Sequence, residues 1–367
     1  MKRMQVLMLG LVLAGGCAGI DRDGSASEQE RLVKVEKICF LGWTNSWKIS
    51  NRECDLIVVP AINHVMSFAL KGGSNLLWVA PDVKGPMIQE PGEKWRNFGG
   101  DKVWPTDEAL WRRYMGRRWP PSYAFDGGQA FVEPLLNGVR MTSSEDPDFG
   151  AVCVREFVMD PEQPLVHIRQ YYDKKQGAAV DMTLWTVTQV RQPAFCLLPL
   201  GREENGQRYR KLGGLQGDAF STHGSVLSLK NDPGVCQKVG VAPDPSYPAG
   251  WVAALYKKEK VVFLQSHQLE VGAIYPDQGC DAEIFAGNNL LGLYCEMELL
   301  GPMVTLSVGQ RHCHDIVWQI VRVNSEEVRD PGQTGKRIFQ AHEMALKRLS
   351  VVDSRAFHVS KPDKSNR

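Results

Sequence analysis

Apolar and polar residues alternate in many short runs between residues 33 and 323. A period of two is typical of β-strands, in which successive side chains point to opposite faces of a sheet. Turn-forming pairs such as Asn51-Arg52 and Asn137-Gly138 separate the runs. Because strand follows strand, the pattern predicts an all-β chain with two large antiparallel sheets packed face to face.

One pair of runs organises the rest of the chain. Residues 282–286 and 293–300 predict two strands joined by a turn at residues 287–289. In the second strand, Glu296 and Glu298 share one face, and the opposite face is apolar. Two carboxylates so placed either face solvent or line a polar cleft, where each raises the other's pKa, as acid–base chemistry requires. We favour the cleft.

An aromatic stretch at residues 81–123 interrupts the strand rhythm, and we expect an ordered excursion over a sheet face. It brings Lys102 close to Trp104, an arrangement that suits a sugar ring stacked on an indole, although a tryptophan taken alone more often covers a core. Farther along, Trp185 and Gln189 share one face of a long predicted strand. All four are candidate carbohydrate contacts.

Two further polar residues stand in apolar strands. Lys238 could reach into a cleft or extend to its rim. His267 ends the strand predicted at residues 261–267; a structural histidine is the commoner outcome there, and carbohydrate binding is the alternative. The one clear helix is predicted at residues 336–350, with an apolar stripe that we expect to pack on the outside of the sandwich. Together with a polar tail it forms a C-terminal segment over residues 326–367.

The N-terminus predicts export. Residues 1–16 have a basic start, an apolar stretch too short to span a membrane, and small residues at the end, which are the three parts of a signal peptide. Cys17 follows, and the arrangement resembles a bacterial lipobox, which implies lipid attachment to Cys17. Residues 17–30 would then be a polar tether from the membrane of the cell envelope. The alternative is an ordinary signal peptide with an incidental cysteine.

Composition and motifs exclude several classes of protein. Lys and Arg number 43 against 42 Asp and Glu, so there is no electrostatic signature of nucleic-acid binding. No phosphate-binding loop, dinucleotide fingerprint, HExxH or GxSxG motif is present. Cys313 stands between two histidines, but adjacent strand residues point opposite ways, so they make a poor zinc site. We expect no metal, no cofactor and a monomer.

Several blocks together resemble a known family. They are Leu76-Leu77-Trp78 and residues 99–105, 184–190, 237–240, 275–280 and 296–302. The blocks resemble a bacterial family of exported proteins of unassigned function, related to the galactose mutarotase (aldose 1-epimerase) superfamily. The resemblance implies a mutarotase-like β-supersandwich over residues 31–325 whose concave sheet binds a sugar.

The resemblance also implies residue roles. A late-strand glutamate is the general base in mutarotases, so Glu298 or Glu296 would take that role, and we favour Glu298 for its place relative to the end of the motif. Lys102 would match a mutarotase arginine and could act as an acid. Thr188-Gln189-Val190 stands where mutarotases have Thr-Asn-His, and His167 and His223 match the second catalytic histidine only by rough position.

These roles lead to three functional hypotheses. The first is a carbohydrate-binding lipoprotein with a sugar-accepting cleft, whose catalytic turnover stays open. The second is a carbohydrate-active enzyme of the aldose epimerase or lyase type, with a late-strand glutamate as base. The third is a structural envelope protein with a vestigial cleft.

Overall fold

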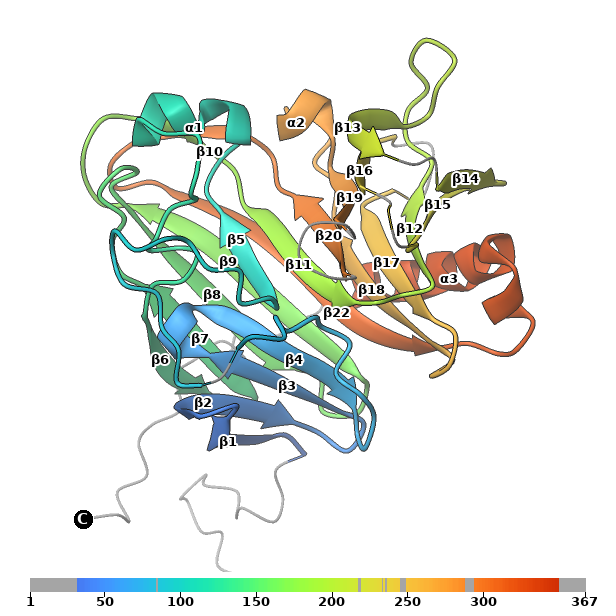
Figure 1. Ribbon diagram of the computed structural model, residues 1–367, viewed down its shortest axis with the longest axis horizontal. Helices are drawn as coiled ribbons and strands as arrows, with labels where there is room; N and C mark the ends of the chain where they lie inside the picture. Colours follow the sequence, from blue (N-terminus) through green and yellow to red (C-terminus); the bar gives the residue numbers. More distant parts are fainter. Residues whose placement is uncertain are drawn as a thin grey trace, which may run out of the picture. The chain divides into compact units, whose positions relative to one another are not determined.

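Two ten-stranded antiparallel sheets dominate the computed structural model (Figure 1). The structure describes residues 32–83, 85–216, 219–232, 234, 236–244, 249–287 and 294–349. The predicted signal peptide, Cys17, the tether, residues 288 and 289 of the predicted turn and the polar tail after residue 349 lie outside the described residues. Export and lipid attachment therefore stay predictions.

The first sheet brings together strands from both ends of the sequence. In spatial order its strands are β1 (Lys34–Phe40), β2 (Trp43–Ser50), β3 (Cys54–Val59), β4 (His64–Leu70), β5 (Asp101–Trp104), β11 (Trp185–Arg191), β20 (Tyr294–Leu300), β19 (Ala282–Gly287), β16 (Cys236–Val241) and β13 (Arg210–Gln216). The hairpin predicted around residues 282–300 is confirmed, because β19 and β20 pair antiparallel with Glu283 opposite Glu298.

The second sheet contains the remaining long strands. Its order is β14 (Phe220–His223), β15 (Val226–Lys230), β12 (Phe195–Pro199), β17 (Trp251–Tyr256), β18 (Val261–His267), β22 (Arg311–Arg322), β9 (Leu165–Lys174), β8 (Ala151–Met159), β7 (Gly138–Ser143) and β6 (Ala130–Leu135). A separate small sheet pairs β10 (Val180–Met182) with β21 (Val304–Leu306). The predicted two-sheet sandwich is confirmed.

Apolar side chains from both sheets fill the space between them. Met297 and Leu299 of the first sheet belong to the same buried cluster as Phe263 and Trp318 of the second. The face predicted to be apolar from the alternation in β20 is therefore the inner face of the first sheet. Its opposite face, which carries Glu296 and Glu298, points away from the inter-sheet core.

Three α-helices accompany the sheets in the described part of the chain: α1 (Glu108–Met115), α2 (Pro276–Gly279) and α3 (Pro331–Leu349). The predicted C-terminal helix is confirmed as α3, and its stripe residues Ile338 and Ala341 pack against apolar side chains of the second sheet. Single-turn 3-10 helices lie at Pro60–Ile62 and Glu327–Arg329.

The prediction that residues 81–123 form only an excursion over a sheet face was wrong. The aromatic stretch holds α1, which starts at the N-cap Asp107 and ends at Gly116, and also β5, a central strand of the first sheet. Its apolar residues follow no single period, so periodicity could not find either element. Farther along the chain, Gly224, with φ +61°, turns the chain between β14 and β15.

Buried polar groups cross the inter-sheet core. Arg155 of β8 and Asp101 of β5 form an ion pair, with 1% and 0% of their side chains exposed. The other Asp101 oxygen accepts a hydrogen bond from Thr188 at 2.7 Å, and Thr188 accepts one from Gln265 at 2.8 Å. This chain of hydrogen bonds ties β5, β8, β11 and β18 together across the sandwich.

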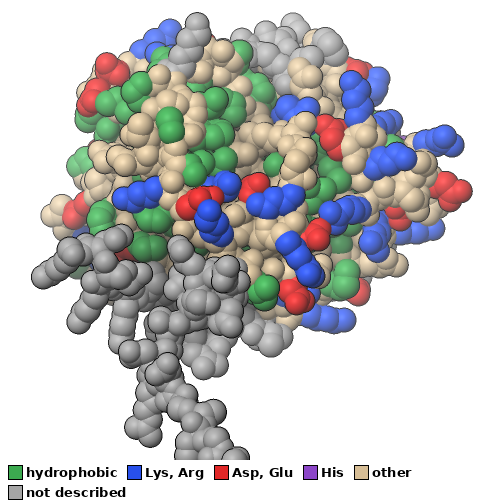
Figure 2. All heavy atoms as spheres, turned by 90° about the horizontal axis from the view of Figure 1, so that it is seen from below, with side chains coloured by type: hydrophobic (Ala, Val, Ile, Leu, Met, Phe, Trp, Pro, Cys, Tyr) green, Lys and Arg blue, Asp and Glu red, His purple; other side chains and the backbone are tan. Residues whose placement is uncertain are grey.

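The described part of the chain contains no candidate membrane-spanning helix, metal site or disulfide. It has no helix whose length and hydropathy would let it cross a membrane. Within the same residues, no group of acidic, histidine or cysteine side chains has the arrangement of a metal site. The eight described cysteines are free thiols. Basic and acidic side chains lie beside one another on the face shown in Figure 2.

Candidate functional site

The candidate site lies on the outer face of the first sheet, over β5, β11, β20, β19 and β16; we call it the site face. Strand register sets one row of side chains across it. Lys102 of β5 pairs with Val187 of β11, which pairs with Glu298 of β20, followed by Glu283 of β19. Gly240 of β16 follows in this row, and a Cβ there would lie 2.8 Å from Cys280 Sγ and from Leu212 Cδ1 and 3.0 Å from Glu283 Cγ, so only glycine fits beside these side chains.

A second row follows two residues along the strands. Gln189 of β11 pairs with Glu296 of β20, which pairs with Phe285 of β19 and then Lys238 of β16. Paired residues in antiparallel strands project to the same face. Segments that are far apart in the sequence therefore bring Lys102, Gln189, Lys238, Glu296 and Glu298 together.

Lys238 is the electrostatic centre of these two rows. Its Nζ lies 2.8 Å from Glu283, 3.1 Å from Glu298 and 3.6 Å from Asp277. Burial lowers the pKa of Lys238, but the surrounding carboxylates outweigh burial and hold it well above its ordinary value. The ammonium is therefore permanently charged, and it neutralises carboxylates that could not otherwise be buried together.

Trp104 and Trp185 lie on the site face but below its surface. Trp185 donates Nε1–H to Glu298 at 2.6 Å, and the Lys238 ammonium covers its ring at 4.6 Å from the centroid. Trp104 donates Nε1–H to Asp126 at 3.0 Å, and Asp126 also bonds His64. The two indoles are 6% and 1% exposed, so the predicted stacking of a sugar on them does not fit. They position carboxylates instead.

Glu296 and Glu298 differ although they share a face. Glu298 is 1% exposed, and one of its oxygens already contacts both Trp185 and Lys238. Glu296 is half-buried and accepts a hydrogen bond from the Gln189 amide at 2.8 Å. Burial, and then the charge of Glu298, raise the pKa of Glu296 to about 7. At neutral pH this carboxyl can therefore both give and take a proton.

The raised pKa of Glu296 makes a prediction about stability. Between its ordinary pKa of 4.5 and about 7, the folded protein keeps a proton on Glu296 that the unfolded chain has lost. We expect the free energy of unfolding to fall as the pH rises through this window, and the Glu296→Gln variant to lose this part of the slope. Denaturant unfolding at several pH values measures it, and equal slopes for both proteins would contradict the assigned pKa.

Lys102 and Gln189 offer polar atoms without partners. Lys102 is 1% exposed, and within the described residues its ammonium has no hydrogen-bond or ion-pair partner; it faces the Trp104 ring, 5.9 Å from the centroid. Oε1 of Gln189 is buried and has no hydrogen bond among the same residues. A buried polar atom without a hydrogen bond is costly, so an outside acceptor for Lys102 and an outside donor for Gln189 would be favourable.

His267 is not on the site face. It is fully buried on β18 of the second sheet, where Nδ1 lies 2.9 Å from His314 and Nε2 lies 3.3 Å from Asp281. This inter-sheet position does not fit the predicted carbohydrate contact. Alternation along β18 predicted which neighbours share its face, but it could not tell which layer that face meets.

Sequence reasoning missed three residues near the site. Glu283 was detectable, because the register of the predicted hairpin places it opposite Glu298. Asp277 stands between Pro276 and Gly279, a composition typical of a turn; its backbone N–H donates to Asp107 at 3.0 Å and so ties α2 to the N-cap of α1. Both helices lie at the same end of the site strands (Figure 1). Trp119 is 49% exposed and stacks on Trp111 at 5.8 Å, so it is an accessible indole beside Trp104.

Comparisons with other proteins identify the fold and not the family. No family model matches the sequence, and no curated protein matches it significantly. Among solved structures, a galactose mutarotase-like protein from Lactobacillus casei superposes with a TM-score of 0.50 at 8% identity, covering 75% of this chain and 99% of that one.

Two further solved structures superpose less closely. A galactose mutarotase related enzyme from Lactobacillus acidophilus gives a TM-score of 0.47 at 8% identity, covering 76% of this chain and 98% of that one. A TPR-domain containing protein from Parabacteroides distasonis gives 0.48 at 11% identity, and the match covers 75% of this chain but 47% of that longer one. With its two ten-stranded sheets and C-terminal helix, the chain has a galactose mutarotase-like fold.

Proposed function

We propose that this protein binds a carbohydrate on the site face, with Lys102, Gln189 and Glu296 as its polar contacts. The observation that carries the proposal is the buried Lys102, whose ammonium faces the Trp104 ring but has no hydrogen-bond or ion-pair partner within the described residues. A sugar presents hydroxyl groups that donate and accept at once. One hydroxyl can accept from Lys102 while a neighbouring one donates to Oε1 of Gln189 or to Glu296.

The positions of these groups suit a ligand of this kind. Lys102 and Gln189 are diagonal neighbours on paired strands, a relation that separates side chains by about 7–8 Å, and Glu296 lies directly opposite Gln189. Trp119 adds an exposed indole next to the buried Trp104. It can supply the apolar stacking surface that the buried indoles cannot.

Calorimetric titration with a panel of neutral mono- and oligosaccharides tests the proposal. We expect at least one sugar to bind, and Lys102→Met to weaken its affinity by about 10- to 100-fold, the worth of a hydrogen bond to a charged group. Lys258→Met, at an exposed lysine in the turn between β17 and β18, is the matched control and should bind as the wild type does. If no sugar of the panel binds, the structural envelope protein becomes the better hypothesis.

Glu296 favours a second candidate function, an aldose 1-epimerase-type isomerase. A carboxyl with a pKa of about 7 is suited to take the proton of an anomeric hydroxyl and return it. We assign this role to Glu296 rather than to Glu298, because Glu298 already forms an ion pair with Lys238. Polarimetry on fresh α-anomers should then show turnover that Glu296→Gln slows by about 10²- to 10⁴-fold. Equal rates in the two proteins would remove Glu296 from the reaction.

A further inference from the structure

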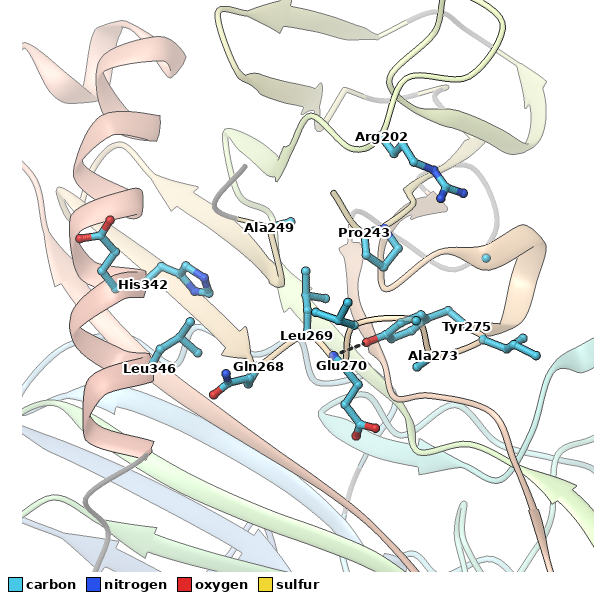
Figure 3. A pocket seen from close by; sticks show the side chains of 15 residues that line it. Arg202, Pro243, Ala249, Gln268, Leu269, Glu270, Ala273, Tyr275, His342 and Leu346 are labelled. Atoms are coloured by element: carbon cyan, nitrogen blue, oxygen red, sulfur yellow. Dashed lines mark hydrogen bonds between the residues drawn. The ribbon is translucent and has the colours of Figure 1, made fainter. Parts of the chain in front are cut away.

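A pocket of about 730 Å³ lies beside α3 and the loop between β18 and α2 (Figure 3). Pockets that hold small molecules usually enclose about 300–1,000 Å³, so this one is large enough for a ligand. It is distinct from the site face: Tyr275 and Gly279, at the two ends of α2, line it, whereas Asp277 between them pairs with Lys238.

The pocket has an apolar rim that is held in place. Val271 and Ile274 of the loop are 86% and 74% exposed, although large apolar side chains rarely gather in the open on soluble proteins. The backbone N–H of Glu270 donates to the Tyr275 hydroxyl at 3.0 Å, and Met303 N–H donates to the carbonyl of Ile274 at 2.7 Å. The rim is thus fixed before any ligand arrives.

The pocket lining also includes the charged Arg202, Glu270 and Glu343, and one buried polar atom lies in it. His342 of α3 is 2% exposed, and within the described residues its Nδ1 has no hydrogen-bond partner. Its ring points from the helix toward Ala249 and Leu269 (Figure 3). Burial lowers the pKa of His342 to about 4, so the ring is neutral at physiological pH.

We assign the proton of the neutral His342 ring to Nε2. The backbone of Ala249 favours a ring proton, and Nδ1 has no hydrogen-bond partner within the described residues. A neutral imidazole carries one N–H, so with the proton on Nε2 the Nδ1 atom is an acceptor.

We propose that this pocket binds a small, largely apolar molecule that carries one hydroxyl or N–H donor. The apolar body packs against the loop and Leu346, and the donor bonds Nδ1 of His342. A ligand without that donor would leave the buried acceptor unsatisfied, so the pocket discriminates between apolar molecules of the same shape.

Two probes of similar shape test the proposal on the full chain. The first, 2-naphthol, has an O–H donor, and the second, 2-methoxynaphthalene, has none. Ligand-observed NMR titration should give an affinity for 2-naphthol about 5- to 10-fold tighter than for the ether, the worth of one hydrogen bond. His342→Phe keeps a ring in place but removes the acceptor, and it should lower the affinity for 2-naphthol to the affinity for the ether.

A pair of variants on α3 locates the binding. Leu346→Trp fills the pocket and should abolish binding of both probes. Met344→Trp makes the same change at a residue that is 49% exposed and is not among those that line the pocket, so it should bind as the wild type does. Absence of 2-naphthol binding, unchanged binding in Leu346→Trp, or equal affinity of the wild type for both probes would each overturn the proposal. The last comparison needs no variant, so it stands even if His342→Phe fails to fold.

Discussion

Replacing Asp101 with alanine is expected to lower the free energy of unfolding by about 3–5 kcal/mol, the typical loss when one partner of a buried ion pair is removed. The change leaves the Arg155 guanidinium between the two sheets, 1% exposed and without its carboxylate, and it also removes the acceptor of the Thr188 hydroxyl. Arginine does not deprotonate in proteins, so the buried charge cannot be relieved. Denaturant unfolding measures the loss.

Two further variants separate the ion pair from the packing. Asp101→Ala combined with Arg155→Met removes both charges and should recover at least half of the lost stability, because an apolar replacement of a buried pair is often neutral. Arg322→Met breaks the exposed pair with Glu53 and should cost less than about 1 kcal/mol. Equal losses in Asp101→Ala and Arg322→Met would mean that the inter-sheet pair contributes no more than a surface contact.

Lys238→Met is expected to be the second most damaging change and to lower the free energy of unfolding by about 2–3 kcal/mol at pH 7. This loss is somewhat below that of a fully buried pair because the lysine side chain is 18% exposed. Without the ammonium, Glu283, Glu298 and Asp277 repel one another in a desolvated site. Burial already raises the pKa of Glu283 and of Asp277, and loss of the cation raises both further.

The sign of the pH dependence checks this explanation. Protonation of the carboxylates removes their repulsion, so the stability difference between Lys238→Met and the wild type should shrink as the pH falls from 7 to 5. Thermal unfolding at both pH values measures it, with Lys258→Met as the control that should change little at either. A difference that stays constant with pH would show that Lys238 contributes through packing alone.

Local patterns predicted the elements on which the site depends. The alternation in residues 293–300 assigned Glu296 and Glu298 to the face opposite the core, and the same reasoning grouped Trp185 with Gln189. Both results follow from the fixed period of two in a strand, which needs no knowledge of the neighbouring strands. The long helix at the C-terminus was predictable for the same reason, because its period shows in one continuous segment.

Accessibility was not predictable. Trp104 is covered by Trp111 and Trp119 of the aromatic stretch, and Trp185 is covered by Lys238, which reaches it on the same face from β16. The sequence indicates indoles near a polar patch, but which indole faces solvent depends on what packs over it. That is why Trp119, which has no predicted role in the sequence analysis, replaces both as the candidate stacking surface.

By itself the sequence determined the all-β class, the position of the C-terminal helix, and which side chains share a face within each strand, since all three follow from local periodicity. Only the tertiary structure decided that Lys102 and Lys238 meet the hairpin that carries Glu283 and Glu296, because strands that are distant in the sequence pair in a register that no local pattern contains. It alone also separated His267 from this site, since two sheets give every inner residue a second layer to face.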